Sequence, residues 1–166
     1  MCRALIHDEI NIRHVGHRSP SPDQPAWKLE KLLDEACSDG TLLDLDGDGQ
    51  PELLTFSPFH GEVLRIWRLT DGKYQLDYAH PEPLEFLHAI WAGQINGKPT
   101  ILIGHRKGKR ELFALTWDSE SKEYSFQTLD TDTGPANVTC FEGDSRQLIV
   151  AANRETNEVA LYVVEE

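Results

Sequence analysis

The stretch with the clearest chemistry is DLDGDGQPELL, residues 44–54, which places four carboxylates on a glycine-rich loop. Alternate carboxylates on a tight loop converge, and calcium takes several oxygen ligands of this kind. Gly49 lies where such a loop needs a sharp turn, and the next residue can add a backbone carbonyl. The spacing therefore predicts a calcium site with these ligands: Asp44, Asp46, Asp48, Gln50 and Glu52.

A helix–loop–helix calcium site is the nearest rival, because its loop uses a similar carboxylate spacing. That site needs a bidentate glutamate at its twelfth position, where this chain has Thr55. The flanking residues form short apolar runs, which are typical of strands rather than helices. The spacing thus favours a strand–loop–strand calcium site that stabilises the fold. A solvated acidic turn without metal and a loop that contacts a ligand directly are the alternatives.

The acidic loop belongs to a repeat. Residues 44–55 align with residues 92–103 at an offset of 48, which places Gly49 on Gly97 and Pro51 on Pro99. Residues 142–150 repeat the turn and the apolar run that follows it. Turn signals separate short apolar segments that are typical of strands covered on both faces, namely 62–69, 111–117 and 158–164. A period of roughly 45 residues with three or four short strands predicts propeller blades.

We therefore expect an all-β fold, a β-propeller or partial propeller built from about four blade-like antiparallel units of roughly 45 residues. The units form a single domain over residues 1–166 and are expected near 2–33, 40–78, 87–129 and 136–166. Residues 26–36 also carry apolar side chains at helical spacing, but the repeat favours a strand at 27–33.

The last unit stops after EVALYVVEE, without the fourth strand that the other units carry. Either residues 5–15 complete this blade, or residues 159–164 form an unpaired apolar edge. The second arrangement is favoured, because four full blades at this period need slightly more residues than the chain has. The expectation is a homodimer that completes the propeller, or a fragment of a longer parent chain.

The acidic loop resembles the repeats called FG-GAP or VCBS. Their signature is a DxDxDG loop followed by the sequence Pro-Asp-Leu or Pro-Glu-Leu. The stretch DLDGDGQPELL matches this signature. The later copies in this chain, GQINGKP and EGDSRQ, keep the turn and lose the carboxylates. The resemblance implies a calcium-binding propeller with the loop between the first two strands of a blade. The chain is also distantly similar to aldos-2-ulose dehydratase-type propellers, from which no catalytic residue is transferred.

Seven histidines form the second candidate feature. In the blade interpretation, His17, His60 and His105 follow second strands, and His80 and His88 lie between blades. Both kinds of loop open on one face, opposite the acidic loop, because successive antiparallel connections alternate between the two ends of the strands. This face could bind zinc or another divalent ion, with His17, His88 and His105 as catalytic candidates. The alternative is that they are ordinary loop histidines.

The net charge limits the classes of partner that the chain is expected to bind. Lys and Arg number 16 against 28 Asp and Glu, a net charge of −12. This balance argues against nucleic acid, since phosphate binding needs clustered basic side chains. No apolar run approaches the roughly 18 residues that cross a membrane, and the polar N-terminus is unlike a signal peptide. A complete chain would be cytoplasmic, whereas the compartment of a fragment stays open.

Together these features predict a calcium-supported, non-catalytic binding domain of propeller type for a protein or carbohydrate partner. The alternative is an enzyme, a metal-assisted lyase or isomerase that acts on a small sugar through the histidine-rich face. At least three histidines within about 5 Å of one another, with an acid beside them, would favour the enzyme. The propeller fold alone does not distinguish a binding domain from an enzyme, because propellers carry unrelated functions.

Overall fold

The structure is a computed structural model, and it describes residues 29–144 and 146–165. These residues form eleven strands in three antiparallel sheets and contain no helix. There is accordingly no helix in this part of the chain that is long and apolar enough to cross a membrane. The expected all-β class is confirmed.

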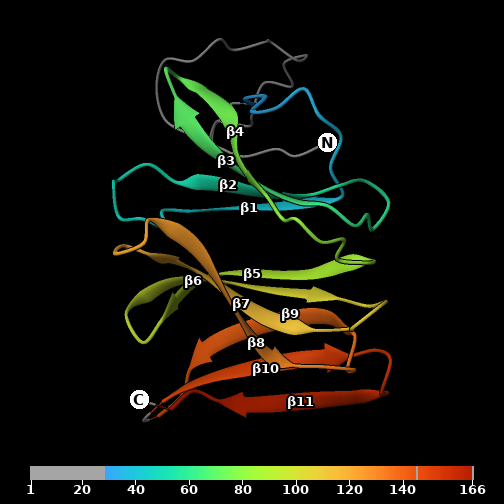
Figure 1. Cartoon of the computed structure of the whole chain (residues 1–166). Coiled ribbons are helices and arrows are strands. Elements are labelled where there is room, and N and C mark those ends of the chain that lie inside the picture. The colour runs from blue at the N-terminus through green and yellow to red at the C-terminus, as the bar shows by residue number, and fades with distance from the viewer. Residues whose placement is uncertain (1–28, 145, 166) are drawn as a thin grey trace, which may run out of the picture.

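The three sheets follow one another along the chain and are stacked in that order (Figure 1). The first sheet consists of β1 (Asp39–Leu43), β2 (Glu52–Phe56), β3 (Leu64–Thr70) and β4 (Lys73–Ala79). The middle sheet consists of β5 (Leu87–Ile95), β6 (Lys98–His105), β7 (Leu112–Asp118) and β8 (Glu123–Asp130). The last sheet has three strands, β9 (Pro135–Glu142), β10 (Gln147–Asn153) and β11 (Glu158–Val163).

The middle sheet is buried on both faces, which explains why its strands are nearly continuous apolar runs. Ile101 and Ile103 on β6 belong to the core shared with the first sheet. Leu102, between them in the sequence, belongs to the core shared with the last sheet. All three side chains are fully buried. Because successive side chains on a strand point to opposite faces, one short segment supplies both cores.

Strand β5, the first strand of the middle sheet, contacts both β1 and β9, the first strands of its neighbours. The sheets coincide closely with the expected units at 40–78, 87–129 and 136–166. Most of the expected unit at 2–33 lies outside the described residues. Within residues 29–38 the strand expected at 27–33 is absent, except for an isolated bridge at Glu30, and there is no helix. All three sheets are open rather than closed on themselves.

Candidate metal centre

The acidic loop connects β1 to β2 and is organised by its own backbone. The Asp44 carboxylate accepts hydrogen bonds from the backbone N–H groups of Gly47 and Gly49, each at 2.9 Å. Asp46 accepts from the N–H of Asp48 at 3.1 Å, and Asp48 accepts from that of Gln50 at 2.7 Å. Both glycines have positive φ, 78° and 88°, a region that side chains disfavour. The loop thus holds its aspartates in place through local hydrogen bonds.

Three of the expected ligands come together. Carboxylate oxygens of Asp44, Asp46 and Asp48 all lie within 4.8 Å of one another. Asp48 is exposed and the other two are half-buried, so an ion can reach the group from solvent. Carboxylate oxygens are hard ligands and suit calcium or magnesium rather than a soft metal. The donor set therefore fits calcium, and these three side chains would hold it.

Glu52, the first residue of β2, has polar partners of its own. Its side chain is 1% exposed, and its Oε2 accepts a hydrogen bond from the Leu45 N–H at 2.8 Å. It is not part of the aspartate group. Burial raises the pKa of Glu52, and the Asp46 charge adds to the rise, while the Leu45 N–H and Arg68 oppose it. Glu52 therefore connects the start of β2 to the backbone at the start of the acidic loop. Gln50 is exposed and contributes its N–H to Asp48.

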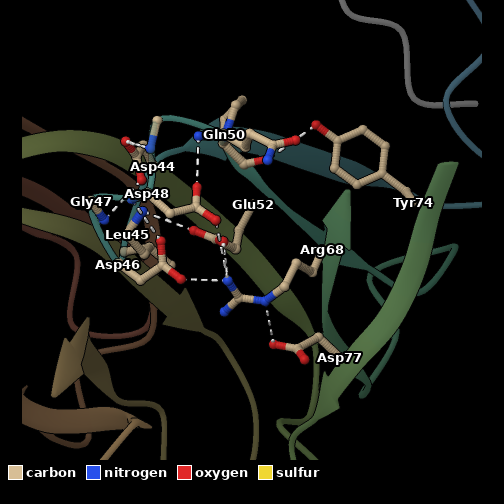
Figure 2. A network of polar contacts seen from close by, with 12 residues as sticks. Asp44, Leu45, Asp46, Gly47, Asp48, Gln50, Glu52, Arg68, Tyr74 and Asp77 are labelled. Atoms are coloured by element: carbon tan, nitrogen blue, oxygen red, sulfur yellow. Dashed lines mark hydrogen bonds and ion pairs between the residues drawn. The ribbon is translucent and has the colours of Figure 1, made fainter. Parts of the chain in front are cut away.

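Arg68 on β3 is the residue that the sequence did not single out. Its Nη1 bonds to Asp46 and lies 3.2 Å from Glu52 Oε1 and 3.9 Å from Asp48 Oδ2. Its Nε lies 3.4 Å from Asp77 Oδ2. Figure 2 shows Asp46 and Glu52 pointing to one side of the guanidinium and Asp77 to the other. The available signal was a basic residue inside the apolar run EVLRIWRL, on the strand paired with β2.

Arg68 also links the loop to the middle sheet. Its Nη2 donates to the Tyr124 hydroxyl at 3.4 Å, and its guanidinium lies 5.5 Å from the centre of the Trp117 ring. Tyr124 in turn donates to Asp77 at 2.6 Å. Burial lowers the pKa of Arg68, but the hydrogen bond with Asp46 and the nearby charges outweigh it, so the net direction is upward. Arg68 thus remains cationic and partly neutralises the carboxylates.

The histidines in the described part of the chain, His60, His80, His88 and His105, lie at the strand ends opposite the acidic loop. The rings of His60 and His88 are stacked, with centroids 4.6 Å apart and planes 8° apart, and His60 also stacks on Phe86 at 4.7 Å. His105 is 2% exposed and lies 3.2 Å from a Glu111 carboxylate oxygen. His17 lies outside the described residues.

A zinc site on that face finds no support in the described part of the chain. Across residues 29–144 and 146–165, the aspartate group is the one place where three metal-ligating side chains converge. His88 donates from Nδ1 to the Ala136 carbonyl, 2.8 Å away, and His105 donates from Nδ1 to the Lys107 carbonyl at 2.9 Å. Both candidates are therefore engaged with backbone carbonyls.

Comparisons of this chain with protein-family models, with curated proteins and with solved structures return no match.

Proposed function

We propose that the chain is a calcium-supported, non-catalytic binding domain of β-propeller type for a protein or carbohydrate partner. The observation that carries this proposal is the convergence of Asp44, Asp46 and Asp48 within 4.8 Å on the β1–β2 loop. A bound cation would offset the mutual repulsion of these carboxylates, which Arg68 offsets only in part. Calcium would therefore stabilise the edge of the first sheet.

The arrangement of the sheets supports the propeller interpretation. Three consecutive antiparallel sheets are stacked in chain order, with their first strands adjacent. The acidic loop joins the first two strands of its sheet, which is where FG-GAP and VCBS repeats carry their calcium loop. The remaining blades would come from a second copy of the chain, as in the homodimer expected from the sequence.

The loops at the end opposite the calcium loop are the proposed partner face. Phe59 is 96% exposed, and its neighbour His60 stacks on Phe86. Two cations also lie over the Phe86 ring: Arg106 Cζ is 4.9 Å and Lys107 Nζ 5.2 Å from its centre. Phe59, His60 and Phe86 all have positive φ, 53–64°, which is strained for side-chain-bearing residues and is frequent at binding sites. Exposed rings beside cations suit a sugar or a protein loop.

The enzyme alternative, a metal-assisted lyase or isomerase, has weaker support. Among the described histidines, the rings of His60 and His88 stack, but neither belongs to a group of three metal-ligating side chains. His105, the residue nearest to a carboxylate, is buried rather than presented on the loop face. A binding role needs only the exposed rings and cations.

Calorimetric titration with calcium tests the proposal. Wild-type protein should bind one calcium ion, and magnesium should bind more weakly, because it demands stricter geometry and dehydrates reluctantly. Asp46→Asn should weaken calcium binding at least about tenfold, which is about 1.4 kcal/mol. Asp71→Asn is the matched control, because Asp71 lies in the β3–β4 turn at the same end of the sheet. Absence of calcium binding, or equal binding by Asp46→Asn, would contradict the proposal.

The partner face is tested separately on a glycan array with wild-type protein and a Phe59→Ser variant. Loss of signal in the variant is expected, since the exposed ring is the largest apolar contact on this face. An unchanged signal in the variant would place carbohydrate binding elsewhere.

A further inference from the structure

Arg68 places an internal cation beside the carboxylates of the proposed calcium site. Its Nη1 bonds to Asp46 and lies 3.9 Å from Asp48 Oδ2, so the guanidinium contacts two of the three aspartates that converge on the loop. Among the ion pairs of the described residues, those of Arg68 alone reach these aspartates. The protein therefore supplies one positive charge to this loop from its own chain.

The sequence of β3 explains why this arginine points inward. Arg68 follows Ile66 by two positions, and Ile66 packs in the core between the first and middle sheets. Since side chains alternate along a strand, Arg68 lies on the same inner face. Its side chain is 26% exposed, and it faces the buried Glu52 at 3.2 Å. A charge held in this way is screened less than one in solvent.

Calcium and Arg68 would compete for the same carboxylates. The ligand oxygens of calcium lie about 2.3–2.6 Å from the ion. An ion held by Asp46 and Asp48 would be within roughly 6 Å of Arg68 Nη1, because this nitrogen is bonded to Asp46 Oδ2. Two cations this close repel each other, and the repulsion is stronger in a partly buried site than in water. Each cation should therefore weaken the hold of the other on Asp46.

The same guanidinium joins the acidic loop to the middle sheet. Its Nη2 donates to the Tyr124 hydroxyl on β8 at 3.4 Å, and its Cζ lies 5.5 Å from the centre of the Trp117 ring on β7. Its Nε lies 3.4 Å from Asp77, which accepts from Tyr124 at 2.6 Å. In Figure 2, Asp46 and Asp77 lie on opposite sides of this group. A change in the contact with Asp46 therefore acts on a group that packs on the middle sheet.

We propose that Arg68 is an internal counter-cation that competes with calcium for Asp46 and couples the acidic loop to the contact between the first and middle sheets. Without calcium, Arg68 neutralises part of the loop and ties it to the middle sheet. Calcium displaces the guanidinium from Asp46 and leaves it with Asp77 and Tyr124. Arg68 thereby lowers the calcium affinity and transmits calcium binding to Trp117. This role of Arg68 rests on the calcium site of the proposed function.

Calorimetric titration of Arg68→Met with calcium tests the competition. The variant should bind calcium at least about tenfold more tightly than wild type, because a positive charge close to the ion is removed. Arg65→Met is the matched control, since Arg65 lies on the same strand and pairs with Glu35 instead, and it should bind like wild type. Arg68→Lys keeps the charge and should stay within about threefold of the wild-type affinity.

Tryptophan fluorescence tests the coupling and needs no change at Arg68. Calcium should alter the emission of the wild-type protein, because the guanidinium moves relative to the Trp117 ring. Trp117→Phe should abolish this change. Trp91→Phe is the matched control and should retain it, since Trp91 lies in the same sheet but packs in the core shared with the last sheet.

Circular dichroism establishes that each variant is folded. Equal calcium affinity of wild type and folded Arg68→Met would overturn the competition and leave the calcium site in place, as would Arg68→Lys binding as tightly as Arg68→Met. A wild-type emission that calcium leaves unchanged, or a change that survives in Trp117→Phe, would overturn the coupling. Absence of calcium binding by wild type and Arg68→Met alike would overturn the proposed function as well. Binding by Arg68→Met alone would support the competition and contradict a calcium site in the wild-type protein.

Discussion

The first two strands of the first sheet and those of the middle sheet are joined by connections of very different length. In the first sheet, β1 and β2 are joined by residues 44–51; in the middle sheet, β5 and β6 are joined by Asn96 and Gly97 alone. Both residues of the short turn have positive φ, 49° and 70°, as a two-residue hairpin requires. Joining the strands therefore needs two residues, and the others in the acidic loop serve to hold carboxylates.

The strands next to the two connections also carry different residues at matching positions. At the offset of 48 residues, Glu52 corresponds to Thr100 and Arg68 to Thr116. Both glutamate and threonine are buried, but Thr100 donates to the nearby Lys98 carbonyl at 2.9 Å, whereas Glu52 requires Leu45 and Arg68. The buried charges are thus present only where the acidic loop is present. They belong to the loop and not to the sheet.

The largest effect is expected when the countercharge is removed. Arg68→Met should lower the free energy of unfolding by about 3 kcal/mol without calcium, because it leaves Glu52 and Asp46 without their partner. Calcium should recover more stability in this variant than in wild type. Arg65→Met on the same strand is the control, since its pair with Glu35 is longer, 3.7 Å, and Glu35 is 53% exposed.

Urea unfolding at fixed calcium and with chelator measures both variants. A loss in Arg68→Met no larger than that in Arg65→Met would mean that the loop charges are not coupled to the guanidinium.

The comparison predicts that the long connection can be replaced by the short one. Substituting Asn-Gly for residues 44–51 should preserve the β1–β2 pairing, because the middle sheet uses this turn at the same register. The variant should lose the calcium-dependent part of its stability, about 2.7 kcal/mol at calcium one hundred times above its dissociation constant. Circular dichroism and calcium-dependent melting test the two parts. Loss of the β1–β2 pairing would show that the loop is needed to join the strands.

A pH effect should distinguish Glu52 from Thr100. Because burial raises the folded-state pKa of Glu52 above its ordinary value of 4.5, the folded protein holds the proton more tightly than the unfolded chain. This contribution to stability is fully present below pH 4.5 and is lost as pH rises through the folded-state pKa. The unfolding free energy of wild type relative to Glu52→Gln should therefore fall as pH rises from about 4.5. Urea titrations at a series of pH values measure it, and a constant difference would contradict the assignment.

The smallest effects concern two matched glycines. Gly49 and Gly97 have φ of 88° and 70°, and a Cβ added at either would touch nothing within 4 Å. Gly49→Ala and Gly97→Ala should therefore each cost about 1 kcal/mol through backbone conformation alone. Calcium should widen the loss at Gly49 and leave the loss at Gly97 unchanged. An equal loss of stability in Gly49→Ala with and without calcium would show that Gly49 does not contribute to calcium binding.

Local features of this protein could be predicted from its sequence, and pairings between strands could not. The aspartate spacing and the Gly49–Gly97 alignment depend on residues adjacent in the chain, so the loop and the turn were found. The contact between Arg68 and Glu52 depends on the register of β2 with β3 and on burial. The Arg68–Tyr124 contact depends on how two sheets pack, which no local pattern encodes.

The same reason explains the histidines. The position of His60, His80, His88 and His105 at one end of the sheets follows from strand alternation, which can be counted from the sequence. The burial of His105 beside Glu111 and the stacking of His60 on His88 depend on side-chain packing.

Scanning calorimetry in calcium and in chelator tests the central claim most directly. A ligand that binds only the folded state raises the unfolding midpoint. At calcium about one hundred times above its dissociation constant, the midpoint should rise by about 5 to 10 °C for a chain of this size. Asp46→Asn should show about half of this rise or less. Equal midpoints for the wild-type protein in calcium and in chelator would contradict the assignment of Asp44, Asp46 and Asp48 as a calcium site.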